Sequence, residues 1–322
     1  MIRLGVIGTG RIAARFMQDI ELVPEIQAVC IYNPHIGSAK RFAGTYQVGL
    51  ASDDWEQFLS EVDAVYIASP HETHVSYAQK ALQKQKHVLC EKPMAFSRTE
   101  AEDLFAIAKE KRLVLMEAIK TAYCPGFNGL LETAGSGVIG TVRDVEACFT
   151  RLTDPAGRER TDPVYGGSVI EYGTYVLLPM VKIFGGNPKD VQFQSIKDEK
   201  GVDLFTKINL FYEQGFGLGK TGVGVKSEGE LIISGTKGYI YVKAPWWMTK
   251  EFEVRFEDPG KKEIHTYEYE RSGLQYELQA FVKEIQAHKK EYEAKEHMSI
   301  AIAGVMEKFF EVKVSKGTER VQ

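Results

Sequence analysis

A lysine, a glutamate and a tyrosine are the side chains of this chain best suited to acid–base chemistry. Lys92 follows an apolar run, residues 87–90, that stops abruptly at Glu91, and Pro93 comes next. The run predicts a buried parallel strand, and open α/β sheets bind ligands at the carboxyl ends of such strands. An ammonium group at that place can stabilise a developing alkoxide and lower the pKa of a neighbouring hydroxyl group.

The glutamate and the tyrosine follow a pair of glycines, residues 166 and 167. The glycines predict a turn that opens a helix, and Glu171 and Tyr175, four residues apart, project from one face of it. A phenol has a reference pKa of about 10, which a cation within about 4–6 Å lowers. We therefore expect Tyr175 to give or take a proton, with Lys92 as the cation. The residues also permit the alternative in which Lys92 carries the proton and Tyr175 only orients the substrate.

These side chains need a scaffold, and the first 120 residues predict one. Residues 2–7 form a short apolar strand, and residues 8–13 (GTGRIA) open a helical pattern directly after it. Glycines there permit a tight turn and close backbone approach, and a diphosphate can rest on the amide groups of the helix N-terminus. The predicted dinucleotide site includes Gly8, Thr9, Gly10, Arg11 and Ile12.

The end of the second predicted strand, residues 27–32, should meet the adenosine ribose of such a cofactor. An NAD enzyme usually has Asp or Glu there, whereas this chain has Asn33. An amide can bond either a hydroxyl group or a phosphate, and no carboxylate repels the phosphate. We therefore expect NADP or NAD, with a slight preference for NADP. Lys40 and Arg41 are candidate phosphate neighbours, or simply solvated helix charges.

Further strand and helix repeats follow. A helix through Trp55 should be capped by Ser52 or Asp53. A buried strand over residues 64–68 then leads into residues 69–74 (SPHETH), whose two histidines lack the four-residue spacing of a helical metal site, so no metal is expected. This loop and the loop that begins at Glu91 both follow strand ends, where a cofactor binds. The predicted cofactor site therefore also includes Ser69, Pro70, His74, Glu91 and Lys92.

The whole chain predicts an α/β protein of two domains. Residues 1–120 should form a doubly wound parallel Rossmann sheet of about six strands. Residues 121–322 should form an α+β domain with a mostly antiparallel open sheet, which binds substrate and mediates oligomerisation. Its loop over residues 154–165 carries prolines and charges and is expected to be mobile or a lid. The free face of the second sheet suggests a homodimer or a higher homo-oligomer.

The composition excludes several other classes of protein. The 322 residues, 44% of them hydrophobic, can fill two cores, and a formal net charge of −4 gives no reason to expect nucleic acid or an acidic membrane. The four cysteines lie far apart with no Cys-x-x-Cys pair, which argues against zinc and disulfides. The N-terminal residues 1–8 (MIRLGVIG) reach a glycine too soon to form the apolar part of a signal peptide. No apolar run approaches the roughly 20 residues of a membrane helix. We expect a cytoplasmic protein with a small-molecule substrate.

Residues 91–93 (EKP), together with the glycine turn near residue 8, resemble the Gfo/Idh/MocA family, named for glucose-fructose oxidoreductase and inositol dehydrogenase. Pro70 and His74 match a proline and a histidine of that family. The resemblance covers nearly the whole chain and implies a cis peptide bond between Lys92 and Pro93.

Residues 166–175 also resemble the family, with two departures. Glu171 stands where Asp is usual, and Tyr175 resembles the dihydrodiol and xylose dehydrogenase branch rather than inositol dehydrogenase. The simpler alternative is that Tyr172 and Tyr175 are helix aromatics that only pack on the sheet.

The resemblance implies an NAD(P)-dependent oxidoreductase that transfers a hydride between nicotinamide and a carbinol or carbonyl carbon of a sugar, polyol or cyclic diol. Its catalytic residues would be Lys92, Tyr175 and Glu171, and its substrate contacts would be Lys120, Tyr123, Arg151 and Tyr172. If Lys120 faces the pocket, we expect an anionic or strongly polar substrate, although the side chain pointing to solvent is an equal alternative. A non-catalytic NAD(P)-binding regulator or scaffold of the same fold remains the second functional hypothesis.

Overall fold

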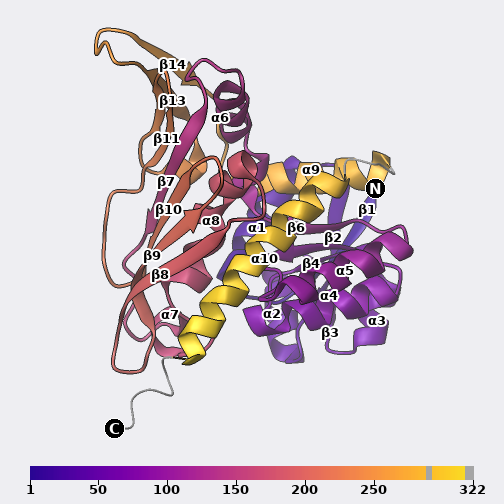
Figure 1. Ribbon diagram of the computed structural model, residues 1–322. Helices are drawn as coiled ribbons and strands as arrows, with labels where there is room; N and C mark the ends of the chain where they lie inside the picture. Colours follow the sequence, from indigo (N-terminus) through magenta and orange to yellow (C-terminus); the bar gives the residue numbers. More distant parts are fainter. Residues whose placement is uncertain (288–291, 316–322) are drawn as a thin grey trace. The chain divides into compact units, whose positions relative to one another are not determined.

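The computed structural model describes residues 1–287 and 292–315 and divides into two compact units (Figure 1). Unit 1 comprises Met1–Lys120 and Glu270–Ser299, and unit 2 comprises Thr121–Tyr269 and the residues from Ile300 onwards. The expected two-domain division differs from this in one respect, because residues 270–299 group with unit 1.

Unit 1 contains a six-stranded sheet in which every neighbouring pair is parallel, in the order β3-β2-β1-β4-β5-β6. The central strands are apolar on both faces, as a sheet covered by helices on both sides requires. The predicted doubly wound fold is confirmed. Its strands are β1 (Ile2–Ile7), β2 (Ile26–Tyr32), β3 (Leu50–Ser52), β4 (Ala64–Ile67), β5 (His87–Glu91) and β6 (Leu115–Ala118). Its helices include α1 (Arg11–Asp19), α2 (Ile36–Thr45), α3 (Trp55–Ser60), α4 (His74–Gln83), α5 (Arg98–Glu110) and α9 (Leu274–Ala287).

The helix after β3 begins later than the sequence suggested. The carboxylate of Asp54 accepts a hydrogen bond of 2.9 Å from the backbone N–H of Gln57, so Asp54 is the cap of α3. The predicted caps, Ser52 and Asp53, were wrong. Ser52 is the last residue of β3, where it pairs with Tyr32, and a residue held in a ladder cannot also begin the helix.

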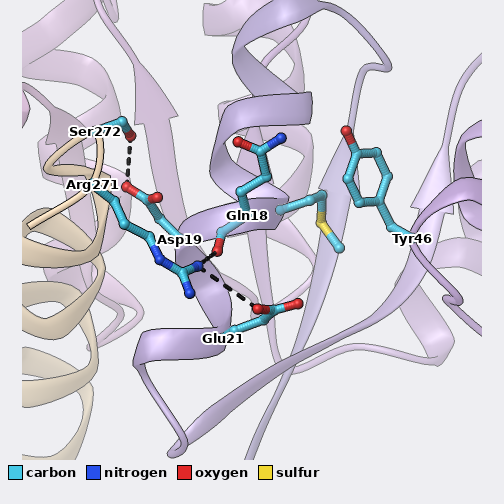
Figure 2. Close-up of a pocket in the computed structure, with 7 residues that line it drawn as sticks. Gln18, Asp19, Glu21, Tyr46, Arg271 and Ser272 are labelled. Carbon is cyan, nitrogen blue, oxygen red and sulfur yellow. Dashed lines mark hydrogen bonds and ion pairs between the residues drawn. The ribbon is translucent and has the colours of Figure 1, made fainter.

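A cluster of polar contacts at the carboxyl end of α1 explains why the chain after residue 269 belongs to unit 1. Figure 2 shows Arg271 reaching the backbone carbonyl of Gln18, and its guanidinium lies 3.7 Å from the carboxylate of Glu21. The hydroxyl of Ser272 donates to Asp19 over 2.6 Å, and Asp19 is almost fully buried. These groups line a cavity of about 530 Å³, but they satisfy one another, and we assign it no ligand.

Unit 2 contains an eight-stranded sheet in the order β14-β13-β12-β11-β7-β10-β9-β8. Only β7 and β10 pair in parallel, so the expected mostly antiparallel sheet is confirmed. Its strands are β7 (Val142–Thr150), β8 (Asp190–Lys197), β9 (Asp203–Phe211), β10 (Phe216–Gly222), β11 (Leu231–Gly235), β12 (Tyr239–Val242), β13 (Glu251–Arg255) and β14 (Lys262–Thr266).

The long helix α8 (Ser168–Phe184) lies against β7, β9 and β10. Two glycines of β10 make this close packing possible. A Cβ atom on Gly217 would lie 2.8 Å from the sulfur of Met180, and one on Gly219 would lie 2.8 Å from a methyl group of Val176. Larger side chains there would push the helix off the sheet, so β10 helps to fix the height of α8 above the strands.

Three further helices complete the description. Helix α6 (Pro125–Gly135) starts unit 2, the short helix α7 (Arg158–Thr161) lies within the charged loop expected over residues 154–165, and α10 (Tyr292–Ser315) ends the described chain. Within the described ranges, no helix has both the length and the apolar character that crossing a membrane requires.

Candidate functional site

The predicted cofactor residues of unit 1 gather at one edge of its sheet. Gly8 follows β1, Asn33 follows β2, Ser69 lies just after β4, and Lys92 follows β5. These four strands are neighbours and parallel, so their carboxyl ends meet at the same edge.

The glycine turn after β1 has a backbone that only glycine can adopt. Gly8 has φ +102°, and a Cβ atom there would lie 2.5 Å from the carbonyl oxygen of Ala68. An added Cβ atom on Gly10 would meet no atom within 4 Å, and the first turn of α1 carries no acidic residue. The backbone amide groups at the start of α1 are therefore suited to bind a diphosphate.

Asn33 connects the end of β2 to this turn. Its Nδ2 donates to the hydroxyl of Thr9 over 3.0 Å, and its Oδ1 accepts from the backbone N–H of His35 over 2.9 Å. A second amide hydrogen can donate to a ribose hydroxyl or a phosphate, and Oδ1 has a second lone pair that can accept from a ribose hydroxyl. Two predicted cofactor residues, Thr9 and Asn33, are thus brought into contact.

A hollow of about 450 Å³ lies beside the end of β2 and was missed in the sequence. Three aromatic residues line it together with polar and charged ones such as Glu56 and Lys80. The ring centroids of Tyr32 and Trp55 are 5.2 Å apart, and those of Trp55 and Tyr77 are 5.3 Å apart. Burial raises the pKa of Tyr32 to about 12, so its hydroxyl group stays neutral. The three aromatic residues are spread over 46 positions of sequence, and no local motif joins them.

His74 holds together the loops that follow β4 and β5. Its Nδ1 lies 2.8 Å from the carbonyl oxygen of Pro93, and its Nε2 lies 3.0 Å from that of Ser69. The ring is fully buried, and burial lowers its pKa despite these two contacts. Because both nitrogens are engaged by the backbone, the side chain acts on the site by fixing these two loops.

Lys92 is half-buried and follows a fully buried carboxyl group. Glu91 accepts a hydrogen bond of 2.6 Å from the hydroxyl of Tyr66 and one of 3.3 Å from the backbone N–H of Lys92. Burial raises the pKa of Glu91, and the charge of Lys92 opposes that rise. The Lys92–Pro93 peptide bond is cis, as the resemblance implied.

Other buried acids lie in unit 1, among them Glu277 and Glu117. Burial, and then the charge of Glu91, raises the pKa of Glu277 well above its usual value, and neither carboxyl oxygen of Glu277 has a hydrogen-bond partner among the described residues. Two buried carboxyl groups that interact in this way do not readily ionise together. The nearby Lys120 donates to the carbonyl oxygen of Ser272 over 2.6 Å, so its ammonium group is tied to the backbone.

Glu117 should make the stability of the protein depend on pH. Burial raises its pKa to about 7 from 4.5, although the backbone N–H of Met94 donates to it over 3.0 Å. Between these two pH values the folded state binds a proton that the unfolded state has lost, so the free energy of unfolding falls as the pH rises. We expect a loss of about 3 kcal/mol from this group between pH 4.5 and 7.5. Urea unfolding of the protein and of Glu117→Gln at several pH values measures it.

In Glu117→Gln this part of the pH dependence should disappear, because the amide cannot ionise but still accepts from Met94. Glu110→Gln, at the exposed end of α5, is the matched control and should keep the full dependence. Equal pH profiles for the two variants would contradict the assignment.

In unit 2, α8 carries the other predicted catalytic residues. The ring of Phe149, on β7, stacks on Tyr172 at 4.4 Å, stacks on Trp247 at 3.7 Å, and lies 5.1 Å from the ring of Tyr175. Tyr172 is buried, whereas Glu171 and Tyr175 are partly exposed. The ring of Tyr172 therefore packs on the sheet, as the simpler alternative described. The motif over residues 166–175 did not indicate that Phe149 and Trp247 are neighbours of this helix.

The remaining predicted substrate residues lie on two segments of unit 2. Tyr123 belongs to the short helical turn Lys120–Tyr123, where the hydroxyl of Thr121 donates to the carbonyl of Trp247 over 2.8 Å. Arg151 directly follows β7 and is exposed. Within unit 2, Thr121 is thus linked through Trp247 to the aromatic cluster beside Tyr175.

Comparison with known proteins gives two family matches. Residues 2–119 match a model described as an oxidoreductase family with an NAD-binding Rossmann fold, and residues 129–241 match the GFO/IDH/MocA C-terminal domain.

Individual relatives agree with these matches. The chain is 33% identical over 223 residues to scyllo-inositol 2-dehydrogenase (NADP(+)) IolU of Bacillus subtilis. The aligned residues cover 66% of this chain and 67% of the relative. It is 28% identical to trans-1,2-dihydrobenzene-1,2-diol dehydrogenase of Bos taurus, with 86% of each chain covered. The crystal structure of KijD10, a 3-ketoreductase from Actinomadura kijaniata in complex with NADP and TDP-benzene, has a TM-score of 0.82 at 24% identity over 95% of each chain and shows the same fold.

Proposed function

This chain belongs to the Gfo/Idh/MocA oxidoreductase family, and we propose that its Lys92 and Tyr175 act together on one substrate oxygen. The protein is an NAD(P)-dependent oxidoreductase of CH–OH groups. The observation that carries the proposal is the place of Lys92, half-buried at the carboxyl end of β5 on the same sheet edge as the glycine turn.

The chemistry divides between the cofactor and the protein. Bound NAD(P) supplies the hydride acceptor or donor. In the direction of oxidation, the deprotonated oxygen of Tyr175 takes the proton from the substrate hydroxyl and becomes the neutral phenol, and the ammonium group of Lys92 stabilises the developing alkoxide. In the direction of reduction, Tyr175 returns the proton to the carbonyl oxygen. Glu171, one helical turn earlier on α8, orients the same substrate.

The cofactor should occupy the edge of the unit 1 sheet described above. We assign the diphosphate to the turn from Gly8 to Ile12, and the adenosine ribose to Asn33 with Thr9 behind it. The three aromatic rings in the hollow beside Tyr32 offer flat surfaces for the adenine ring, and polar side chains line the rest of it. Ser69 and Pro70 border the cofactor, and His74 and Glu91 hold its surrounding loops.

The substrate is proposed to be a sugar, polyol or cyclic diol. Its hydroxyl groups would meet Tyr123, Arg151, Tyr172 and Lys120 in addition to the catalytic residues. The ammonium group of Lys120, which donates to the carbonyl of Ser272, carries a positive charge that would favour an anionic or polar substrate group. A panel of sugars, polyols, cyclic diols and keto acids, followed by nicotinamide absorbance, tests the proposal. Turnover on at least one class supports it, and no turnover on a broad panel would favour a regulator or scaffold.

Asn33→Asp should shift the cofactor preference from NADP towards NAD. The new carboxylate repels a 2′-phosphate and accepts from a ribose 2′-hydroxyl, while still accepting from the N–H of His35. We expect the ratio of NADP to NAD affinity to fall at least about tenfold, or ~1.4 kcal/mol. Fluorescence titration with each reduced cofactor measures the ratio. The control is Asn187→Asp, an exposed residue in the loop after α8, and an unchanged ratio in Asn33→Asp would contradict the ribose assignment.

We further propose that the protein is a cytoplasmic homodimer. Its four cysteines are free, and large apolar side chains are exposed on strands of the unit 2 sheet, among them Ile196, Phe216 and Ile264. Burial of such side chains is the usual reason for a sheet face to self-associate. Light scattering after size exclusion should give twice the chain mass, with Phe216→Glu shifting it towards the monomer. A wild-type mass equal to one chain would refute the dimer.

A further inference from the structure

The helix that carries Tyr175 lacks a capping side chain of its own. Its N-cap residue is Gly167, which has no side chain to accept from the first free N–H groups. Asp203, the first residue of β9, takes this place from a distant part of the sequence. Its Oδ2 accepts from the backbone N–H of Val169 over 2.9 Å and from the hydroxyl of Ser168 over 2.7 Å.

The contact between Asp203 and the helix start is built into the surrounding structure. Gly167 has φ +102°, and a Cβ atom on it would lie 1.9 Å from Oδ1 of Asp203, so only glycine leaves room for the carboxylate. The hydroxyl of Thr206 also donates to Oδ2 over 3.2 Å. Thr221, on β10, lies 2.8 Å from the hydroxyl of Ser168. Side chains of β9 and β10 therefore both hydrogen-bond to the first turn of α8.

A second element holds the turn before the helix. Lys313, on α10, donates to the carbonyl oxygens of Val164 and Gly166 over 3.1 and 3.2 Å. Its charge also interacts with that of Asp203, which is itself fully buried. Hydrogen bonds, a helix N-terminus and the charge of Lys313 all favour the carboxylate form. Burial nevertheless raises the pKa of Asp203, and its Oδ1 has no hydrogen-bond partner among the described residues.

We propose that Asp203 is a positioning residue for the reaction, which sets the register of α8 and thereby the place of the Tyr175 hydroxyl. This inference rests on the proposed role of Tyr175. Tyr175 lies six residues after Val169, about 9 Å along a rigid helix, so a shift at the first turn is passed on to it. A displacement of about 1 Å in a catalytic group can cost on the order of 100-fold in rate.

Asp203→Asn tests the proposal with little change in volume. Because Val169, Ser168 and Thr206 all donate to Oδ2, an amide oxygen in that place can still accept from them, but the negative charge that strengthens these bonds and faces the N-terminus of α8 is lost. We expect kcat to fall roughly 10- to 100-fold, with the Kd for NADP, a property of unit 1, unchanged. The matched control is Asp190→Asn, an exposed aspartate that likewise begins a strand of this sheet and should leave kcat unchanged.

A double-mutant cycle with Tyr175→Phe separates positioning from general support of the fold. If Asp203 acts through the Tyr175 hydroxyl, adding Asp203→Asn to Tyr175→Phe lowers kcat little further. Losses that multiply in full, or an unchanged kcat in Asp203→Asn, overturn the inference. If Asp203→Asn does not fold, Ser168→Ala, which removes one donor only, takes its place in the same cycle with the same two outcomes.

The two proposals fail in different ways. If Tyr175→Phe alone keeps full kcat, the proposed function is wrong and the inference about Asp203 falls with it. If Tyr175→Phe is impaired but Asp203→Asn is not, only the inference about Asp203 is wrong.

Discussion

Lys92→Met should lower kcat by about 10³ and leave the cofactor bound. Methionine keeps most of the aliphatic stem but removes the ammonium group that stabilises the substrate oxygen. Loss of a single preorganised electrostatic group costs on the order of 10²–10³ in kcat, and loss of a full charge should reach the upper end of this range. The dinucleotide is held mainly by the glycine turn and Asn33, so its Kd should stay within about threefold. Nicotinamide absorbance gives kcat, and fluorescence titration gives the Kd.

The control for this change is Lys109→Met, an exposed lysine in the last turn of α5. It removes the same charge from unit 1 away from the sheet edge and should leave kcat unchanged. If Lys92→Met turned over at the wild-type rate, or lost the cofactor as completely as the activity, Lys92 would have no specific part in the chemistry.

Tyr175→Phe should lower kcat by roughly 10²–10⁴, the usual contribution of a positioned acid or base. Phenylalanine keeps the ring that lies 5.1 Å from that of Phe149, so the variant should fold and bind cofactor normally. The pH profile of kcat/KM adds a second readout, because the limb caused by the tyrosine hydroxyl should be absent in the variant. The matched control is Tyr239→Phe, on strand β12 of the unit 2 sheet.

The outcome also separates the two assignments of the proton. If the pH limb persists in Tyr175→Phe with a modest loss of kcat, Tyr175 is an orienting hydrogen bond and Lys92 carries the proton. If kcat and the pH profile are both unchanged, Tyr175 is only a helix aromatic and the account of the site is wrong.

Strand and helix patterns in the sequence predicted most of the fold because local apolar runs report burial directly. The runs that became β4 and β5 are buried along almost their whole length, and both were predicted. Strands β13 and β14 are harder to recognise in the sequence. In β13 only Phe252 and Val254 are buried, and β14 has no buried residue, so polar residues dilute the apolar pattern.

The site was less accessible to sequence reasoning because several of its contacts join distant residues. Nothing near Asp203 indicates that it caps a helix that begins 35 positions earlier, although the two glycines before Ser168 are a hint of a close neighbour. Glu277 lies on the amphipathic helix α9, where a glutamate is normally on the exposed face, yet it is fully buried. The charged groups that act on Glu277 are Glu91 at the end of β5 and Lys120. The residue spacing within α9 cannot reveal these neighbours.

A crystal structure with NADP and an unreactive analogue of a substrate found on the panel tests the central claim most directly. The account predicts that the Nζ of Lys92 and the Oη of Tyr175 both lie within about 3.2 Å of the same analogue oxygen, with the neighbouring carbon facing the nicotinamide. Side chains that point to different oxygens, or a nicotinamide with no substrate carbon between it and this pair, would contradict it.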